Sequence, residues 1–299
     1  MVISLSLYGT AQDANKNYGI QRITTEIQQL HPGISQNSIR CIFQDHKGLL
    51  WLGTWDGLNR YDGIRFKIIR MAVGNSSLSL SNSTINAINQ DQSHHIWVGT
   101  DGGVNCFSYQ NLRRVQLDFK KNTSLSTDTI HAIHIDAQNQ IWLGSQKGLG
   151  IINAARDSLK LLSEATGIQS VLDHIEIRQI LQFEPSKIWV GTASGLFLVN
   201  LEDKTVRHWN LSTLSDLHLT SLNNYKDSLL FIGTENGLNI LNITDYSMSS
   251  HYLFPEYKTE MGSNVVLSSI VYSDSSLLVG VAAQGMFSFD FQTKEFSPF

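Results

Sequence analysis

Charge is scarce in this chain. Only 16% of its 299 residues are Asp, Glu, Lys or Arg, the formal net charge is −4, and no long run of Lys or Arg occurs. Proteins that hold nucleic acid through its phosphates need a basic patch or stripe. We therefore expect no nucleic-acid partner. Proline is also rare, at four residues, and the apolar content of 41% is ample for a core.

Cysteine is nearly absent, and so are long apolar runs. Cys41 and Cys106 are the only two cysteines. We expect two buried free thiols, and a single disulfide is the alternative. No stretch is long and apolar enough to cross a bilayer, so this segment is not expected to contact a membrane.

The N-terminus carries a short apolar stretch over residues 2–8. Gly9 and Ala11 follow it and fit the −3 and −1 positions of a secretory cleavage site. The pattern predicts that residues 1–17 are the remnant of a signal peptide. A disordered N-terminus without a targeting role is the alternative.

A short phrase recurs six times along the chain. It reads Trp-Leu-Gly-Thr at 51–54 and returns, with substitutions, at 97–100, 142–145, 189–192, 231–234 and 278–281. The glycines of the phrase are Gly53, Gly99, Gly144, Gly191, Gly233 and Gly280, so the period is 42 to 47 residues. A fixed period of this length indicates a repeat architecture.

Residues 38–70 form the best-preserved unit. Four short segments rich in β-formers, at 38–44, 49–54, 58–61 and 64–70, are separated by turn residues such as Asp45, Gly48 and Asp62-Gly63. Four antiparallel strands per repeat of ~45 residues are typical of a β-propeller blade. No unit has the apolar spacing of a helix pair. The sequence therefore predicts an all-β propeller over residues 18–299.

The blade count has two readings. Six blades of four antiparallel strands are expected at roughly 34–72, 80–118, 125–163, 172–209, 216–254 and 263–299. They could close a six-bladed ring or form a seven-bladed ring that lacks its last blade. The second reading is favoured, because the pattern leaves a sheet edge open. Tyr18–Ile23 also looks like a strand, with no assigned place.

The signature from Asp45 to Asp62 resembles the two-component regulator propeller repeat. Gly33 to Ile39 resembles the start of that family, the first four units match it strongly, and the last two are degraded. The family builds the periplasmic sensor regions of hybrid two-component systems in Bacteroides-type bacteria.

That resemblance implies a function. It implies a periplasmic, non-enzymatic sensor that recognises polysaccharide-derived oligosaccharides and regulates polysaccharide utilisation. A second propeller or a sensor dimer partner is also implied. The kinase, receiver and DNA-binding parts of the family are not among these 299 residues.

The candidate ligand site is the mouth of the propeller channel. First strands line such a channel, and the residue after the leading aliphatic of each should face its mouth. These residues are Arg40, Asn86, His131, Arg178, Thr220 and Ser268. Turns between second and third strands share that face and add Trp55, Asp56, Asp101 and Lys147.

Indole faces stack on sugars and guanidinium groups pair with carboxylates, which suits a sugar or uronic acid. We select Arg40, Trp55, Asp56, Asn86, Asp101, His131, Lys147 and Arg178 as ligand-binding residues. The alternative is that these side chains only solvate a water-filled channel.

Other recurring residues are read as structural. Trp51, Trp97, Trp142 and Trp189 are expected to pack between blades, Asn59, Asn105 and Asn239 to bond the backbone, and the first-turn acids to form turns.

No metal, cofactor or catalytic group is predicted. His94-His95, His131 and His134 lack the companions of a zinc site, and no phosphate or dinucleotide motif occurs. A polysaccharide lyase or hydrolase with His131 or Asp56 as general base is an alternative function. A protein-interaction platform is another.

Overall fold

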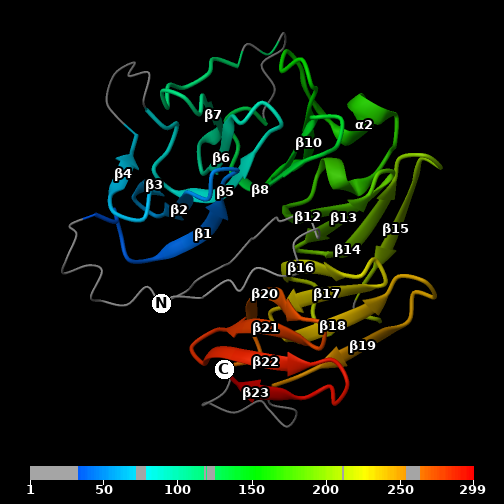
Figure 1. Cartoon of the computed structure of the whole chain (residues 1–299). Coiled ribbons are helices and arrows are strands. Elements are labelled where there is room, and N and C mark those ends of the chain that lie inside the picture. The colour runs from blue at the N-terminus through cyan, green and yellow to red at the C-terminus, as the bar shows by residue number, and fades with distance from the viewer. Residues whose placement is uncertain (1–32, 72–78, 118, 120–124, 211, 254–262) are drawn as a thin grey trace.

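The chain folds into antiparallel sheets arranged like the blades of a propeller (Figure 1). The computed structural model describes residues 33–71, 79–117, 119, 125–210, 212–253 and 263–299. The predicted signal remnant at 1–17 and the predicted strand Tyr18–Ile23 lie outside these residues. The described part contains six blades, of which five are four-stranded and one is three-stranded. The all-β propeller predicted from the repeat is confirmed.

Blades 1 to 3 occupy the first half of the chain. Blade 1 consists of β1 (Ile39–Gln44), β2 (Leu50–Thr54), β3 (Gly57–Tyr61) and β4 (Phe66–Ile69). Blade 2 has β5 (Ile85–Gln90), β6 (Ile96–Thr100) and β7 (Gly103–Phe107), and an isolated bridge from Phe107 to Arg114 stands where a fourth strand was expected. Blade 3 has β8 (Ile130–Ile135), β9 (Ile141–Ser145), β10 (Gly148–Ile152) and β11 (Leu159–Leu161).

Blades 4 to 6 follow the same order. Helix α2 (Leu162–Thr166) and the 3-10 turn η1 (Val171–Asp173) connect blade 3 to blade 4. Blade 4 has β12 (Ile177–Glu184), β13 (Lys187–Thr192), β14 (Gly195–Asn200) and β15 (Thr205–Trp209), and blade 5 has β16 (Leu219–Tyr225), β17 (Leu229–Thr234), β18 (Gly237–Asn242) and β19 (Met248–His251). Blade 6 has β20 (Val266–Ser273), β21 (Ser276–Val281), β22 (Gly285–Asp290) and β23 (Phe296–Pro298).

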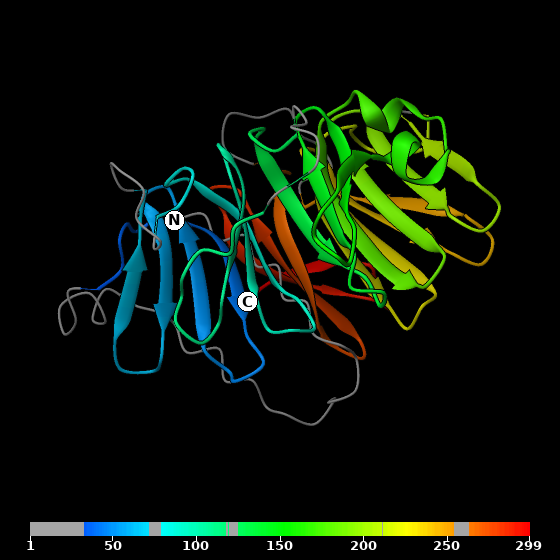
Figure 2. The same ribbon diagram turned by 90° about the horizontal axis from the view of Figure 1, so that it is seen from above.

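Neighbouring blades pack through their first strands. β1 contacts β5, and the series continues through β8, β12, β16 and β20. Within the described residues no comparable contact joins β20 to β1, so the six blades form an arc rather than a closed ring (Figure 1). Figure 2 shows the sheets standing side by side when the molecule is turned.

The tryptophans of the recurring phrase pack between blades, as predicted. Trp51, Trp97, Trp142 and Trp189 are all buried. In blades 1 to 3 each indole Nε1 also donates to the first-turn aspartate, at 2.8 Å for Trp51 to Asp45 and 2.9 Å for Trp97 to Asp91. These aspartates therefore do more than form turns, because they also satisfy a buried N–H.

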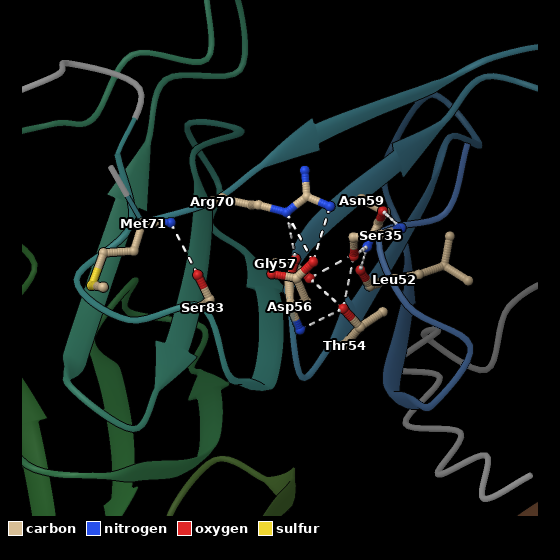
Figure 3. A network of polar contacts seen from close by, with 9 residues as sticks. All are labelled: Ser35, Leu52, Thr54, Asp56, Gly57, Asn59, Arg70, Met71 and Ser83. Atoms are coloured by element: carbon tan, nitrogen blue, oxygen red, sulfur yellow. Dashed lines mark hydrogen bonds and ion pairs between the residues drawn. The ribbon is translucent and has the colours of Figure 1, made fainter. Parts of the chain in front are cut away.

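The hydroxyl that ends the phrase fixes the next turn. Thr54 Oγ1 donates to Gly57 O at 3.0 Å and accepts from the backbone N–H of Asp56 at 3.0 Å. Asn59 accepts from Ser35 N at 2.8 Å and donates to Ser35 Oγ at 2.8 Å (Figure 3). The backbone-bonding role expected for the recurring asparagine is confirmed, and in blades 1, 2 and 5 the bond ties the loop that enters the blade to its third strand.

Two backbone hydrogen bonds show which loops share a face of the propeller. The backbone N–H of Gly57, at the end of the turn between β2 and β3, donates to Ser83 O in the loop that leads to β5 at 2.7 Å. Gly237 donates likewise to Asn264 O, at 2.8 Å. The turns between second and third strands therefore lie beside the loops that enter the next blade, on the face predicted to carry the site.

Candidate ligand site at the channel mouth

Each first strand carries a β-bulge at its second residue. In blade 1 Ile39 pairs with Thr54 and Cys41 with Gly53, which leaves Arg40 outside the ladder. The same register shift isolates Asn86, His131, Arg178 and Thr220. A bulged residue is unpaired and its side chain is re-aimed. The predicted ring at the channel mouth therefore consists of bulge residues.

The predicted ring is wrong in its sixth member. In blade 6 the residue outside the ladder is Leu267, because Val266 pairs with Val281 and Ser268 pairs with Gly280. Ser268 therefore occupies the position of Cys41 in blade 1. The register was ambiguous from sequence because Val265, Val266 and Leu267 are consecutive aliphatic residues.

Arg40 and Trp55 form the blade 1 side of the mouth. The guanidinium carbon of Arg40 lies 4.1 Å from the centroid of the Trp55 ring, which is a cation–π distance. Trp55 is 50% exposed, in the turn between β2 and β3. Among the residues that the structure describes, the buried Nε of Arg40 has no hydrogen-bond partner. This pair thus combines an exposed aromatic face with an unsatisfied cationic donor.

Asn86 and Asp101 form a second pair, from blade 2. Asn86 Nδ2 donates to Asp101 Oδ1 at 2.8 Å and to Ile130 O of blade 3 at 3.2 Å. The Oδ1 of Asn86 is buried and has no hydrogen-bond partner in the described part of the chain. The first of these bonds holds the Asp101 carboxylate at the bulge of β5.

His131 and Arg178 meet at a carboxylate that sequence reasoning did not select. Glu176 Oε1 lies 3.5 Å from His131 Nε2 and accepts from Arg178 Nε at 3.1 Å. Arg178 Nη1 also lies 3.7 Å from Glu235 Oε1. Glu176 directly precedes Ile177, the leading aliphatic residue of β12. A comparison of the residues that precede the leading aliphatic in each blade could have identified it from the sequence. Arg178 is therefore already neutralised by two carboxylates.

Burial governs the charge of His131. It lowers the pKa of the imidazole, while Glu176 raises it, Arg178 lowers it, Asp101 raises it and Arg40 lowers it further. The net direction is downward, which favours the neutral ring at neutral pH. The same balance shows that charges from blades 1, 2 and 4 act together on this ring at the mouth.

Two selected residues are engaged elsewhere. The Asp56 carboxylate accepts from Arg70 Nε at 3.0 Å and lies 3.0 Å from Arg70 Nη2 (Figure 3). The backbone N–H of Lys147 donates to Asp128 Oδ2 at 2.8 Å, and its ammonium lies 3.9 Å from Asp128 Oδ1. Both side chains thus have their charge balanced by a neighbour in their own blade or its entry loop.

A channel of about 700 Å³ runs along the first strands, and Asn86 and His131 line it. Most of its amide side chains join neighbouring blades. Asn89 Nδ2 donates to Ile133 O at 3.1 Å, Gln179 Nε2 to Thr220 O at 2.9 Å, and Asn223 Nδ2 to Ser269 O at 2.7 Å. The amide side chains of the channel wall are therefore largely satisfied by the fold. Of the eight residues predicted to bind ligand, only Asn86 and His131 are among those that line this channel.

The cysteines and histidines add no further chemistry to the mouth. Cys41 and Cys106 are buried free thiols, as predicted, and burial raises the pKa of each to about 12. Among the described residues no group of three or more His, Cys, Asp and Glu is arranged to hold a metal ion. In the same part of the chain, no helix is long and apolar enough to cross a membrane.

The fold and its repeat define the class of this protein as a six-bladed β-propeller built from a recurring sequence repeat. Residues 33–56 and 79–102 match the family model described as the two-component regulator propeller, which confirms the predicted repeat. A 38-residue stretch is 58% identical to histidine kinase P4 of Formosa agariphila. It covers 13% of this chain and 3% of that protein.

Solved structures share the fold. The extracellular domain of the putative hybrid two-component system BT3049 from B. thetaiotaomicron superposes with a TM-score of 0.74 at 22% identity, over 93% of this chain and 36% of that one. The extracellular domain of BT4673 from the same organism, a putative one-component system, gives 0.73 at 21% identity, over 91% and 38%.

A lyase shares the architecture as well. Virginiamycin B lyase from Staphylococcus aureus gives a TM-score of 0.61 at 10% identity, over 85% of this chain and 82% of that one. At these identities the likeness establishes the fold alone. The chain spans little more than a third of the length of the two extracellular domains.

Proposed function

We propose that this chain is a non-enzymatic sensor propeller of a two-component system, located in the periplasm, whose channel mouth binds a polysaccharide-derived oligosaccharide. Its repeat type and its likeness to extracellular domains of such systems support the sensor role. Binding would regulate polysaccharide utilisation through kinase and DNA-binding parts carried elsewhere. A second propeller or a dimer partner would transmit the signal.

The observation that carries this proposal is the Arg40–Trp55 pair. Within the described residues Arg40 of blade 1 has no carboxylate partner, whereas Arg178 of blade 4 has two. An arginine on an exposed indole suits a sugar ring that stacks on Trp55 and bears an acidic group for the guanidinium. We therefore favour an oligosaccharide that contains uronic acid.

Calorimetric titration with a panel of neutral and acidic oligosaccharides tests the proposal. Arg40→Ala should weaken binding of the cognate acidic sugar by roughly tenfold or more, because a hydrogen bond to a charged group contributes about 1.5–3 kcal/mol. Trp55→Ala should also weaken binding, because it removes the aromatic face on which the sugar stacks. Neutral sugars of the same length should bind less tightly to the native chain.

The chain offers a matched control. Arg207 also lies 4.1 Å from an aromatic centroid, that of Tyr246, but it belongs to the outermost strand of blade 4. Arg207→Ala should leave sugar affinity unchanged. Equal loss of affinity in Arg207→Ala and Arg40→Ala, or no loss in either mouth variant, would show that the site is elsewhere.

No observation favours the enzymatic alternative. Asp56, one candidate base, is held by Arg70, and the likeness to virginiamycin B lyase is one of fold only. We expect no cleavage products when the same oligosaccharides are incubated with the protein and separated by chromatography. Products that disappear in His131→Ala would replace the sensor proposal with a catalytic one.

A further inference from the structure

Within the described residues, most cations on the mouth face of the propeller already have a carboxylate partner. Arg70 Nε and Nη2 each lie 3.0 Å from Asp56 Oδ2 (Figure 3). The Lys147 ammonium lies 3.9 Å from Asp128 Oδ1. Each of these charges is balanced within the fold. An acidic ligand that approached either cation would therefore have to displace a carboxylate that remains beside it.

The guanidinium of Arg178 is balanced by more than one carboxylate. Its Nε donates to Glu176 Oε1 at 3.1 Å, and its Nη1 lies 3.7 Å from Glu235 Oε1. Asp101, in the turn between β6 and β7, adds a carboxylate that forms no ion pair with any described residue. Blades 2, 4 and 5 thus place three carboxylates and one guanidinium at the mouth, which leaves this part of the mouth negatively charged.

Arg40 of blade 1 differs from these cations. In the described part of the chain its buried Nε has no hydrogen-bond partner, and its guanidinium lies on the exposed ring of Trp55. The charges of Arg40, Asp101 and Glu176 all act on the imidazole of His131, so the cation and the carboxylates face the same mouth. A ligand that enters the mouth would therefore meet a free positive charge at blade 1 and an excess of negative charge beyond it.

We infer, on the basis of the proposed sugar-binding function, that the mouth selects an oligosaccharide with one acidic group flanked by neutral sugars and disfavours polyanionic chains. The acidic group pairs with Arg40 while its sugar ring stacks on Trp55. A second carboxylate or a sulfate on a neighbouring sugar meets cations that are already neutralised, and it faces Asp101, Glu176 or Glu235. Like charges placed together oppose binding, and such unfavourable contacts contribute to specificity as favourable ones do.

Trimers of galacturonic, glucuronic and mannuronic acid test this selectivity in calorimetric titrations at low ionic strength. Each trimer is prepared as the triacid, as a monoacid with two methyl esters, and as the neutral triester. The native chain should bind the monoacid of one trimer at least about tenfold more tightly than its triester, because a hydrogen bond to a charged group is strong. It should bind the same monoacid at least about fivefold more tightly than the triacid, because the added carboxylates meet like charges. Added salt should narrow both differences, since it screens charge.

Two variants free a cation at the mouth. Glu176→Gln/Glu235→Gln releases Arg178, and Asp56→Asn releases Arg70. Each variant should raise the affinity for the triacid at least about tenfold relative to that for the monoacid, because a second carboxylate then finds a free guanidinium. Partly exposed ion pairs contribute little to stability, so the melting temperatures of both variants should stay close to that of the native chain.

Blade 4 offers a matched control at the opposite end of its strands. Glu184 ends β12 and pairs with Lys187 at 2.7 Å, whereas Arg178 lies near the start of β12. Glu202 is exposed in the turn that follows β14. Glu184→Gln/Glu202→Gln removes the same charge as the double variant at the mouth, and it should leave the ratio of triacid to monoacid affinity unchanged. An equal rise in this control would show that overall charge sets the selectivity, which would overturn the inference.

Two further results would overturn the inference. Tighter binding of a triacid than of its monoacid to the native chain would mean that the mouth accepts a polyanion. The proposed sugar sensor would stand in that case, provided that Arg40→Ala still weakens binding. No relative gain for the triacid in either mouth variant would show that Asp56, Glu176 and Glu235 do not determine specificity. Binding of no trimer in any form would instead contradict the proposed function, and the selectivity with it.

Discussion

The first three blades and the last three share the recurring phrase but differ in the hydrogen bonds made around it. In blades 1 to 3 a buried aspartate bonds the indole N–H and two backbone N–H groups of its own turn, as Asp136 does with Trp142, Gln138 and Gln140. In blade 4 Trp189 keeps its buried position, but its Nε1 has no hydrogen-bond partner within the described residues. Blades 5 and 6 replace the indole with Phe231 and Leu278.

The comparison shows that packing alone preserves a blade. The polar bonds of the turn are an addition: blades 1 to 3 have them, and blade 4 keeps its buried tryptophan without one among the described residues. The first half should therefore be more sensitive than the second half to polar substitutions.

The largest effect is expected for Asp91→Ala. The Asp91 side chain is fully buried, binds Trp97 and pairs with Arg156 of blade 3, so its removal leaves a largely buried cation and an indole N–H unpaired. The free energy of unfolding should fall by about 3–5 kcal/mol in urea denaturation. Asp274→Ala, at the first turn of blade 6 where the side chain is 88% exposed, should leave the urea midpoint in place. Similar losses in both variants would contradict the comparison.

Next comes a side chain added to the phrase glycine. Gly99→Val would force its side chain against Ile130 and should destabilise the protein by about 3 kcal/mol, since the junction cannot expand freely. Gly233→Val should behave similarly, because Val266 of the next first strand packs against Gly233 as Ile130 packs against Gly99. Thermal denaturation of the two variants checks this, and a much smaller effect at Gly233 would mean that the blade 5 junction is loose.

A smaller effect distinguishes the contribution of the indole hydrogen bond to stability from that of the packing of the ring. Trp142→Phe and Trp189→Phe remove the same atoms, but only the first leaves a buried carboxylate oxygen of Asp136 without its donor. Trp142→Phe should therefore cost about 2 kcal/mol more than Trp189→Phe. Urea denaturation of both measures the difference, and equal losses would show that the indole bond contributes nothing.

The smallest effect is a pH dependence centred on blade 3. Burial lowers the pKa of His134, although its bond to Gln182 and the charge of Asp136 raise it. The unfolded chain therefore takes up a proton near its ordinary pKa of about 6.5 while the folded chain does so only at lower pH. This contribution to stability is complete above that pKa and is lost as the pH falls through the folded value.

His134→Gln should make the decline in urea midpoint between about pH 7.5 and about pH 5 shallower. His174→Gln, at an exposed position, serves as the control and should keep the native slope. A native slope in His134→Gln would show that other groups cause the decline.

Much of the fold could be predicted from the sequence, and the reason lies in the repeat. The spacing of the phrase fixed the blades, and recurrence separated the packing residues Trp51 and Asn59 from the variable positions. Recurrence carries no information on contacts that occur once. The bond of Arg70 to Asp56 and the role of Glu176 at Arg178 join residues that the repeat does not relate. The bulge was missed because it changes pairing without changing residue type.

The bulge at the second residue of each first strand separates the residues of the proposed ligand site from the hydrogen bonds that hold the sheet. The ladder omits that residue, so Arg40, Asn86, His131, Arg178, Thr220 and Leu267 differ freely while the strands that carry them stay in register. A substitution there alters the chemistry of the mouth and spares the backbone hydrogen bonds. Proteins with this frame can thus acquire new ligands one position at a time, with each change tested on a scaffold that is already stable.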